Sequence, residues 1–419
     1  MEKIGAGQAV AGAVDSYPKR WVPRTVIVRP EKLGAILGMT VPEAEALDGL
    51  NRLGFRVETV EDRWIVFVPS FRPDVAIEED IVEEVARLYG YDRVPATLPC
   101  GATTPGVRPP EEAFVRRLQH LLCGLGLCEV ISYSFISPSA FDRLRFAPDN
   151  PLRRAVALRN PISEEQSVLR TTLLPGLLTV VARNLARRVD DVAVFEVGRV
   201  FYPQNGAALP EERLMLGLAA TGREPRGWES PPRELDFFFL KGVIAALFKG
   251  LAIKGQEFVP LKDHPSLHPG RAARIMARGK TLGFMGEVHP EVAAAYDLPR
   301  RVVVAEFDVG ALMAAQQPVI FTELPRYPGV VRDLAVVVPQ NLLAAKVVAV
   351  VTAAGGDLLR EVQIFDVYQG PKLPAGTKSL AFSLFFRAED RTLTDEEVNA
   401  LVGKILRRLE EEFGAVLRS

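Results

Sequence analysis

A chain of 419 residues is too long for a single hydrophobic core and predicts two to four domains of about 100–200 residues each. Its composition, with 48% hydrophobic and 25% charged residues, is typical of globular proteins and excludes a disordered or fibrous protein. The 51 basic and 52 acidic residues nearly cancel, and no segment is a basic block, so charge alone does not indicate a nonspecific nucleic-acid binder.

Targeting and membrane signals are not evident. The longest apolar runs, such as residues 347–351, are far below the about 18 residues that a membrane-spanning helix needs. The first residues lack a basic region followed by an apolar run, so no secretory signal is indicated. Three cysteines, Cys100, Cys123 and Cys128, are too few for a disulfide scaffold and fit the reducing cytosol. We expect a cytoplasmic protein that does not enter a membrane.

The N-terminal part predicts a connector and a small acidic domain. Residues 1–24 carry Gly and Pro with little periodicity, which is typical of a connector. Residues 25–98 predict a compact α+β domain, and their eight basic and fourteen acidic residues give a net charge of −6 that disfavours DNA binding. The expected elements are, in chain order, a strand at 25–29, helices at 30–37 and 42–53, a hairpin at 55–60 and 64–68, and a helix at 77–89.

The middle of the chain, residues 99–325, mixes helical spacing with β-branched strands. Regular alternation of strand and helix is absent, so an antiparallel sheet with flanking helices is expected. The expected helices are 110–125, 175–187, 237–248 and 290–296. The expected strands are 129–135, 192–201, 214–221, 272–277, 281–288 and 301–309.

The C-terminal part, residues 326–419, shows the order βαββαβ of a ferredoxin-like fold. Thr394 and Glu397 have the spacing of a capping box and predict where the last helix begins. The elements are expected at 334–338, 343–354, 358–367, 379–386, 394–413 and 414–418. The predicted fold class is therefore α+β and multidomain, although many functions use such folds.

Four carboxylates form the sharpest candidate site: Asp74, Asp80, Glu83 and Glu84. On a helix, Asp80, Glu83 and Glu84 occupy positions i, i+3 and i+4 and share one face, and Asp74 lies one loop earlier. Hard oxygen ligands without His or Cys suit magnesium or calcium. The alternative is an acidic first turn that the helix dipole favours and water solvates, and the local pattern alone favours it.

No other pattern indicates catalysis. His264, His268 and His289 lie beside prolines without the spacing of a zinc site, so structural roles are expected. The spacing of Cys123 and Cys128 matches no zinc site either. Neither a phosphate-binding P-loop nor a nucleophile elbow is present. The residues alone thus predict a three-domain protein with one candidate magnesium site and no catalytic residue.

Several stretches, taken in order, carry a resemblance to a known family. They are PSFRPDV at 69–75, EDIVEEVARLYGY at 79–91, LRTTLLPGL at 169–177, FEVGRVF at 195–201, HPGRAA at 268–273, YPGVVRDL at 327–334 and RTLTDEEV at 391–398. With these stretches the chain, from about residue 15 to its end, resembles the β subunit of bacterial phenylalanine–tRNA ligase (phenylalanyl-tRNA synthetase).

The resemblance implies three modules and a supporting role. Residues 25–98 resemble the family's small acidic-motif domain, 99–325 its degenerate class II synthetase domain, and 326–419 its ferredoxin-fold anticodon-binding domain. It implies an (αβ)2 heterotetramer in which the α subunit joins phenylalanine to tRNA(Phe) with ATP. This chain is expected to contribute no catalytic residue, because 283–289 ends without the arginine that a working class II site uses for adenine.

The resemblance also implies sites. It implies a Mg2+ ion shared with the α subunit, and the ligands carried over by position are Asp74, Asp80, Glu83 and Glu84. Phe135, Phe237 and Phe238 are candidate anchors for the partner, and Tyr368 or Phe386 could stack on a base of tRNA. The candidate basic contacts to tRNA are Arg326, Arg332, Lys372, Lys378, Arg387 and Arg391.

Alternatives stay open at this stage. Family members carry, before the connector, a tRNA-binding domain and an editing domain that this sequence lacks, so editing is expected to be absent. The chain could be a fragment, or a free-standing RNA-binding or regulatory paralogue that no longer pairs with an α subunit. The intact four-carboxylate motif favours the subunit, because a paralogue without a partner needs no shared metal site.

Overall fold

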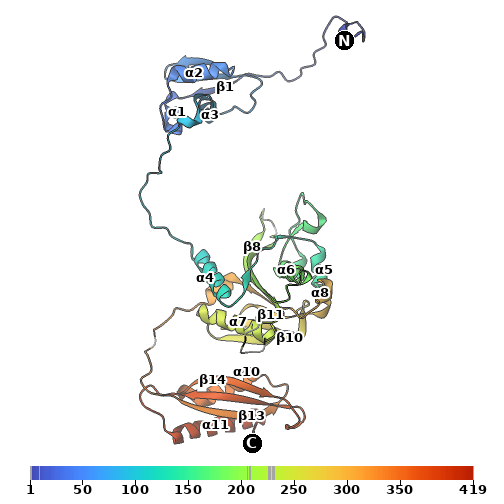
Figure 1. Ribbon diagram of the computed structural model, residues 1–419, viewed down its shortest axis with the longest axis vertical. Coiled ribbons are helices and arrows are strands. Elements are labelled where there is room, and N and C mark those ends of the chain that lie inside the picture. Colours follow the sequence, from blue (N-terminus) through green and yellow to red (C-terminus); the bar gives the residue numbers. More distant parts are fainter. Residues whose placement is uncertain are drawn as a thin grey trace. The chain divides into compact units, whose positions relative to one another are not determined.

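The computed structural model describes residues 2–8, 10–204, 206, 209–224, 228, 232–321 and 323–418. The chain divides into two compact units, Met1–Val107 and Arg108–Ser419 (Figure 1). Within the described ranges, no helix combines the length and the apolar character needed to cross a membrane. The predicted domain boundary after residue 98 lies close to the division between the two units, and the one after residue 325 stays a prediction.

The first unit is a three-stranded antiparallel sheet with three helices, which gather beside β1 in Figure 1. Its elements are β1 (Arg24–Val28), α1 (Pro30–Leu37), α2 (Glu43–Arg52), β2 (Arg56–Val60), β3 (Arg63–Val68) and α3 (Glu78–Tyr89). The sheet order is β1-β3-β2, and alternation along β3 buries Trp64, Val66 and Val68 in one core with Leu50 and Ile81. Each predicted element of this unit is present.

The middle of the chain is a seven-stranded sheet in the order β4-β7-β8-β12-β11-β10-β9. All neighbouring strands are antiparallel except β4 and β7, which are parallel. The strands are β4 (Cys128–Glu129), β7 (Val192–Tyr202), β8 (Glu211–Thr221), β9 (Gln256–Pro260), β10 (Leu267–Ala277), β11 (Lys280–Val288) and β12 (Val303–Asp308). The predicted antiparallel sheet is thus confirmed.

Helices cover both faces of this sheet. Residues of α4 (Pro110–Gly124), α7 (Phe237–Gly250) and α9 (Val309–Ala315) share one core with alternate residues of β8 and β12. Residues of α5 (Ser139–Arg143), α6 (Leu174–Ala186) and α8 (Pro290–Ala295) share a second core with the intervening residues. The strand period of two therefore places the sheet between two apolar layers.

The prediction of one continuous strand at residues 129–135 is wrong. Only its ends are extended in ladders, as β4 and as β5 (Phe135–Ile136), which pairs with β6 (Val168–Leu169) in a separate small sheet. Between them the chain leaves the large sheet, and the backbone N–H and Oγ of Ser132 donate to the Glu196 carboxylate. Alternation of apolar and polar residues could not predict that the chain leaves the sheet here, because the partner of Ser132, Glu196, lies on the distant strand β7.

The C-terminal part confirms the ferredoxin-like order βαββαβ, and its four-stranded sheet is β14-β15-β13-β16. The elements are β13 (Val330–Pro339), α10 (Ala344–Gly355), β14 (Leu359–Tyr368), β15 (Thr377–Phe386), α11 (Asp395–Phe413) and β16 (Val416–Leu417). The predicted capping box is present, because Thr394 Oγ1 accepts from the Glu397 N–H while the Glu397 carboxylate accepts from the Thr394 N–H. Both helices pack on one face of the sheet.

Two glycines of the middle sheet allow close approach of neighbouring chain segments. A Cβ on Gly217 would lie 2.6 Å from Leu177 Cδ1, so α6 presses directly on β8. A Cβ on Gly283 would lie 2.1 Å from the backbone oxygen of Glu306 on the next strand. Because backbone cannot yield as a flexible side chain can, Gly283 is the more restrictive position.

We predict that Gly283→Ala destabilises the middle sheet by about 1–3 kcal/mol, because the added methyl group forces β11 and β12 apart. Gly242→Ala is the matched control, since Gly242 is exposed on α7 with no atom within 4 Å of its added Cβ. That control should be neutral or stabilising by about 0.5–1 kcal/mol. Calorimetry, together with hydrogen exchange of peptides from β11 and β12, would measure the stability of both variants. Equal destabilisation by the two substitutions would contradict the close approach of β11 and β12 at Gly283.

Candidate functional site

The acidic motif lies where β3 connects to α3 in the first unit. Pro69 and Pro73 prevent the connecting loop from continuing the ladder of β3, since proline cannot donate to it. The helix that follows begins with three acidic residues, Glu78, Glu79 and Asp80, which the positive end of the helix dipole favours. The loop and the first turns of α3 therefore bring most of the chain's predicted metal ligands into one region.

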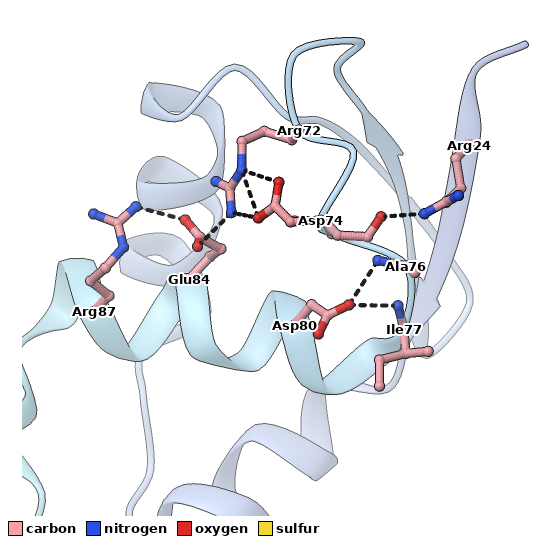
Figure 2. Close-up of polar contacts among 9 residues, drawn as sticks. Arg24, Arg72, Asp74, Ala76, Ile77, Asp80, Glu84 and Arg87 are labelled. Carbon is pink, nitrogen blue, oxygen red and sulfur yellow. Dashed lines mark hydrogen bonds and ion pairs between the residues drawn. The ribbon is translucent and has the colours of Figure 1, made fainter. Parts of the chain in front are cut away.

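Arg72 lies between two of these carboxylates (Figure 2). Its Nε donates to Asp74 Oδ1 at 3.0 Å, and its Nη2 donates to Asp74 Oδ2 at 2.6 Å and to Glu84 Oε1 at 2.8 Å. Arg87 Nη2 donates to the other oxygen of Glu84 at 2.6 Å. The two arginines thus bind both oxygens of Glu84 and both oxygens of Asp74, in charge-assisted hydrogen bonds.

Burial makes this pairing important for Glu84. Its side chain is 8% exposed, whereas that of Asp74 is 60% exposed. Hydrogen bonding from Arg72 holds the pKa of Glu84 below its usual range, although burial opposes the shift, and Arg87 adds to the lowering. Arg72 likewise lowers the pKa of Asp74. Both carboxylates are therefore ionised and compensated at neutral pH.

Asp80 and Glu83 have different surroundings. Asp80 Oδ2 accepts from the backbone N–H groups of Ala76 at 2.7 Å and Ile77 at 2.9 Å, which satisfies donors at the start of α3 (Figure 2). Glu83 is exposed on the solvent side of the same helix. Helical spacing alone suggests one shared face, but Asp80 turns back to cap its helix while Glu84 turns to Arg72.

The structure therefore brings Asp74 and Glu84 together through an arginine and leaves Asp80 and Glu83 outside that pair. Throughout the described ranges, no three His, Cys, Asp or Glu residues form a group that could hold a metal ion. The residue types suit Mg2+, but their arrangement in this chain does not fit it, because the internal cations Arg72 and Arg87 already compensate two of the four carboxylates.

A second polar cluster lies buried in the middle sheet. Arg170 Nη1 donates to Glu196 Oε1 at 2.7 Å, and the two side chains are only 4% and 2% exposed. Ser132 Oγ accepts from Arg170 and donates to Glu196. The stretches 169–177 and 195–201, which are distant in sequence, thus meet in an ion pair that packs the loop before α6 on β7.

Glu306 on β12 lies fully buried in the same sheet without an arginine partner of this kind. Its carboxylate accepts from Thr172 Oγ1 and from the backbone N–H of Leu173. Burial raises the pKa of Glu306 to about 7, and these hydrogen bonds oppose the rise. These contacts tie the start of α6 to β12. Sequence patterns could not indicate the buried polar residues of the middle sheet, because they come from four separate segments around residues 132, 170–173, 196 and 306.

The predicted structural role of the loop histidines agrees with their geometry. In His264, His268 and His289, Nδ1 accepts from the backbone N–H of the residue two positions later. Burial lowers the pKa of His264 to about 4, so this side chain is neutral at physiological pH. Among the candidate anchors, Phe238 and Phe135 are exposed, and Phe237 is half-buried and packs on the core.

Three candidate basic residues of the C-terminal part have partners within the chain. Arg332 pairs with Asp395 at the start of α11, and Arg391 pairs with Glu397 at 2.8 Å. Lys378 Nζ donates to the Leu342 carbonyl, and burial lowers its pKa. These three side chains therefore stabilise the domain through contacts within the chain. Arg326 and Lys372, in contrast, are exposed to solvent.

The face of the ferredoxin-like sheet opposite its helices carries aromatic and cationic side chains together. The Arg418 guanidinium lies 4.7 Å from the ring centroid of Tyr368, and that of Arg387 lies 5.7 Å from the ring of Phe385. The prediction that Phe386 is available for stacking is wrong, because this side chain is fully buried against the helices. Arg418 follows the last short strand, and only strand pairing reveals that it reaches Tyr368.

Comparisons with known proteins match the whole chain. Three family models match, described as the tRNA synthetase B5 domain at residues 26–91, the "Phenylalanyl tRNA synthetase beta chain CLM domain" at 94–309, and the ferredoxin-fold anticodon binding domain at 325–418. The CLM match alone covers more than half of the chain.

The chain belongs to the phenylalanyl-tRNA synthetase β-chain family.

Curated members named "Phenylalanine--tRNA ligase beta subunit" are similar over nearly all of it. The one from Moorella thermoacetica is 45% identical over 100% of this chain and 52% of its own length. Those from Carboxydothermus hydrogenoformans and Bacillus subtilis are 40% and 39% identical over 99% and 98% of this chain, and over 52% and 51% of their own lengths. The chain thus spans about half the length of these β-chain relatives.

The matched domains of this β-chain family member contain the polar features described above. The B5 match holds the arginine-paired carboxylates, the CLM match holds the buried Arg170–Glu196 pair, and the anticodon-binding match holds Tyr368 with Arg418. The resemblance drawn from the sequence motifs is confirmed.

We predict that Glu84→Gln lowers the free energy of unfolding of the first unit by about 1–3 kcal/mol at pH 7, because Arg72 and Arg87 lose a buried charged acceptor. The pKa values of Glu84 and Asp74 are lowered on folding, so their stabilisation is present above the unfolded pKa values and is lost as pH falls below about 4. The difference between wild type and variant should therefore shrink from pH 6 to pH 3.

Glu83→Gln on the same helix is the matched control and should change stability by less than about 0.5 kcal/mol, since Glu83 is exposed. Trp64 is buried in this unit and reports its unfolding, in a background with Trp21→Phe and Trp228→Phe. Urea titrations in which both variants behave alike would show that the arginine pairing contributes nothing.

Proposed function

We propose that this chain acts as the β-type subunit of a phenylalanine–tRNA ligase, in a cytoplasmic (αβ)2 assembly that attaches phenylalanine to tRNA(Phe) with ATP. The single observation that carries the proposal is the match of all three domains, in family order, together with 45% identity to a curated β subunit over the whole chain. The chemistry would belong to the α subunit, and this chain would supply its docking surface and a contact to tRNA.

A non-catalytic role is supported by the middle sheet. Both of its faces are covered by helices, and Gly217 allows Leu177 of α6 to lie directly against the sheet. Among its buried ionisable residues, Arg170 and Glu196 pair with each other, and Glu306 accepts hydrogen bonds from Thr172 and Leu173. The described residues of this sheet thus offer structural polar groups in place of an ATP-binding arginine.

Docking of a partner is supported by exposed apolar side chains in the middle of the chain. Ile131 is 92% exposed, Tyr133 72%, and Phe238 72%. Side chains of this size gain free energy when another protein covers them, at roughly 25 cal/mol per Å² of apolar area. We assign them, with Phe135, to contact with the α subunit.

For Mg2+ we propose binding only in the assembled complex, shared with the α subunit. Asp74, Asp80, Glu83 and Glu84 keep the residue types that such a site needs. Residues of the partner would complete the site, because the wild-type chain alone divides the four carboxylates among Arg72, Arg87, the helix start and solvent. ATP would be a substrate of the complete enzyme.

Co-expression with a cognate α subunit tests the proposal. We expect a stable complex that aminoacylates tRNA(Phe) with phenylalanine, ATP and Mg2+, measured by gel filtration with light scattering and by incorporation of labelled phenylalanine. Absence of any complex, together with tRNA binding by the chain alone, would instead indicate a free-standing RNA-binding paralogue.

Glu83→Gln separates folding from assembly. We expect this variant to keep the stability of the chain and to weaken Mg2+-dependent association with the α subunit at least about tenfold, because only the shared site needs its charge. Glu31→Gln, at an exposed position on α1, is the matched control and should leave association unchanged. Surface plasmon resonance with and without Mg2+ measures the association of each variant with the α subunit. If both variants associate equally well under each condition, Glu83 does not belong to the shared site.

Tyr368 and Arg418 are our proposed centre of the tRNA contact, and the exposed Arg326 and Lys372 are further candidate contacts. Loss of one stacked base is worth about 1–3 kcal/mol, so Tyr368→Ala should weaken tRNA(Phe) binding roughly 5- to 150-fold at fixed salt. Arg408→Ala on the exposed side of α11 is the control and should weaken it little. Filter binding with the αβ complex measures both; equal losses would indicate only general charge attraction.

A further inference from the structure

The acidic motif of the first unit is compensated by the chain itself, which bears on when a metal ion can bind there. Arg72 makes four hydrogen bonds of 2.6–3.1 Å to Asp74 and Glu84, and these occupy both oxygens of Asp74 and one oxygen of Glu84. Its guanidinium also lies 5.7 Å from the ring centroid of Phe55, and its side chain is only 20% exposed. The Arg72 side chain is therefore held in a defined, mostly buried position by several contacts.

A divalent cation and a guanidinium cannot hold the same two carboxylates. Mg2+ binds carboxylate oxygens at about 2.0–2.1 Å, which is shorter than the 2.6–3.1 Å hydrogen bonds that Arg72 makes. Bringing Asp74 and Glu84 to such distances around one ion would leave no space for Arg72 between them. It would also place two cationic centres side by side in a region where Arg87 already contacts Glu84.

We propose that Arg72 is the resident cation of the acidic motif, so that a divalent cation can bind Asp74 and Glu84 only after Arg72 has moved out. The chain by itself is then folded and charge-compensated without a metal ion. Mg2+ binding becomes conditional on an event that displaces Arg72. This inference deepens the proposed function by naming what regulates the shared site, but it concerns the chain alone and can be tested without the α subunit.

The alternative to displacement would be a metal held by Asp80 and Glu83 without the arginine-bound pair. Asp80 already uses Oδ2 for two backbone N–H groups at the start of α3, and Glu83 is exposed. Two such ligands would bind Mg2+ only weakly, because magnesium in proteins with few carboxylates keeps most of its waters. Tight binding therefore requires the carboxylates that Arg72 holds.

The test compares the complete wild-type chain with Arg72→Met, which keeps a side chain of similar length for packing near Phe55 but removes the charge. Isothermal titration with MgCl2 at constant ionic strength should give no saturable binding to the wild type. It should give saturable binding to Arg72→Met that is at least about tenfold tighter than any wild-type signal. The melting temperature of Arg72→Met should fall without metal and recover with MgCl2, but not with NaCl.

Three further variants define the outcome. Arg52→Met on α2, whose exposed side chain pairs with Asp48, controls for loss of a surface arginine and should resemble the wild type. Arg72→Met combined with Asp74→Asn should lose the Mg2+ response. Arg72→Lys, which keeps a cation, should fold even where Arg72→Met does not, and should bind Mg2+ less tightly than Arg72→Met.

Either of two results would overturn the proposal. Wild-type chain that binds Mg2+ as tightly as Arg72→Met would show that the arginine does not exclude the metal. Folded Arg72→Met without any gain in Mg2+ binding over the wild type, or Arg72→Lys that binds Mg2+ as tightly as Arg72→Met, would show the same. Failure to assemble with an α subunit would affect the proposed function only, because every measurement here uses the chain alone.

Discussion

Carboxylates that this chain buries must be compensated within it, and that constraint shapes both of its polar clusters. Removing an ionised carboxylate from water costs several kcal/mol unless hydrogen bonds and opposite charge replace the solvent. Glu84 meets the requirement with Arg72 and Arg87, and Glu196 meets it with Arg170 and Ser132. In each case one arginine, Arg72 or Arg170, comes from a loop, so that loop is held against a helix or a strand.

Glu306 is the informative exception. It is buried with hydrogen bonds from Thr172 and Leu173, and burial raises its pKa to about 7. Binding of a proton thus compensates the carboxylate of Glu306, whereas arginines compensate the carboxylates of Glu84 and Glu196. The same physical requirement has two solutions in one chain, and the choice depends on whether a cation can reach the carboxylate.

Arginine compensation also changes how the acidic motif of this chain should be interpreted. Four carboxylates at suitable spacing predict a metal site, because repulsion among them calls for a cation. In the free chain two internal cations already supply that charge, while Asp80 stabilises the start of its helix. In the assembly that we propose, a metal site shared between subunits would form by exchange of one cation for another, without leaving unpaired charges in the separate chain.

Sequence alone determined the order and type of nearly all helices and strands, the antiparallel middle sheet, the ferredoxin-like C-terminal order and the family, because these depend on local periodicity, capping residues such as Thr394, and short motifs. Only the tertiary structure decided which side chains meet. It moved residues 129–135 out of the large sheet, turned Phe386 inward, and placed Arg72 between Asp74 and Glu84. Those outcomes depend on partners distant in the chain, and the periodicity of a single segment does not contain them.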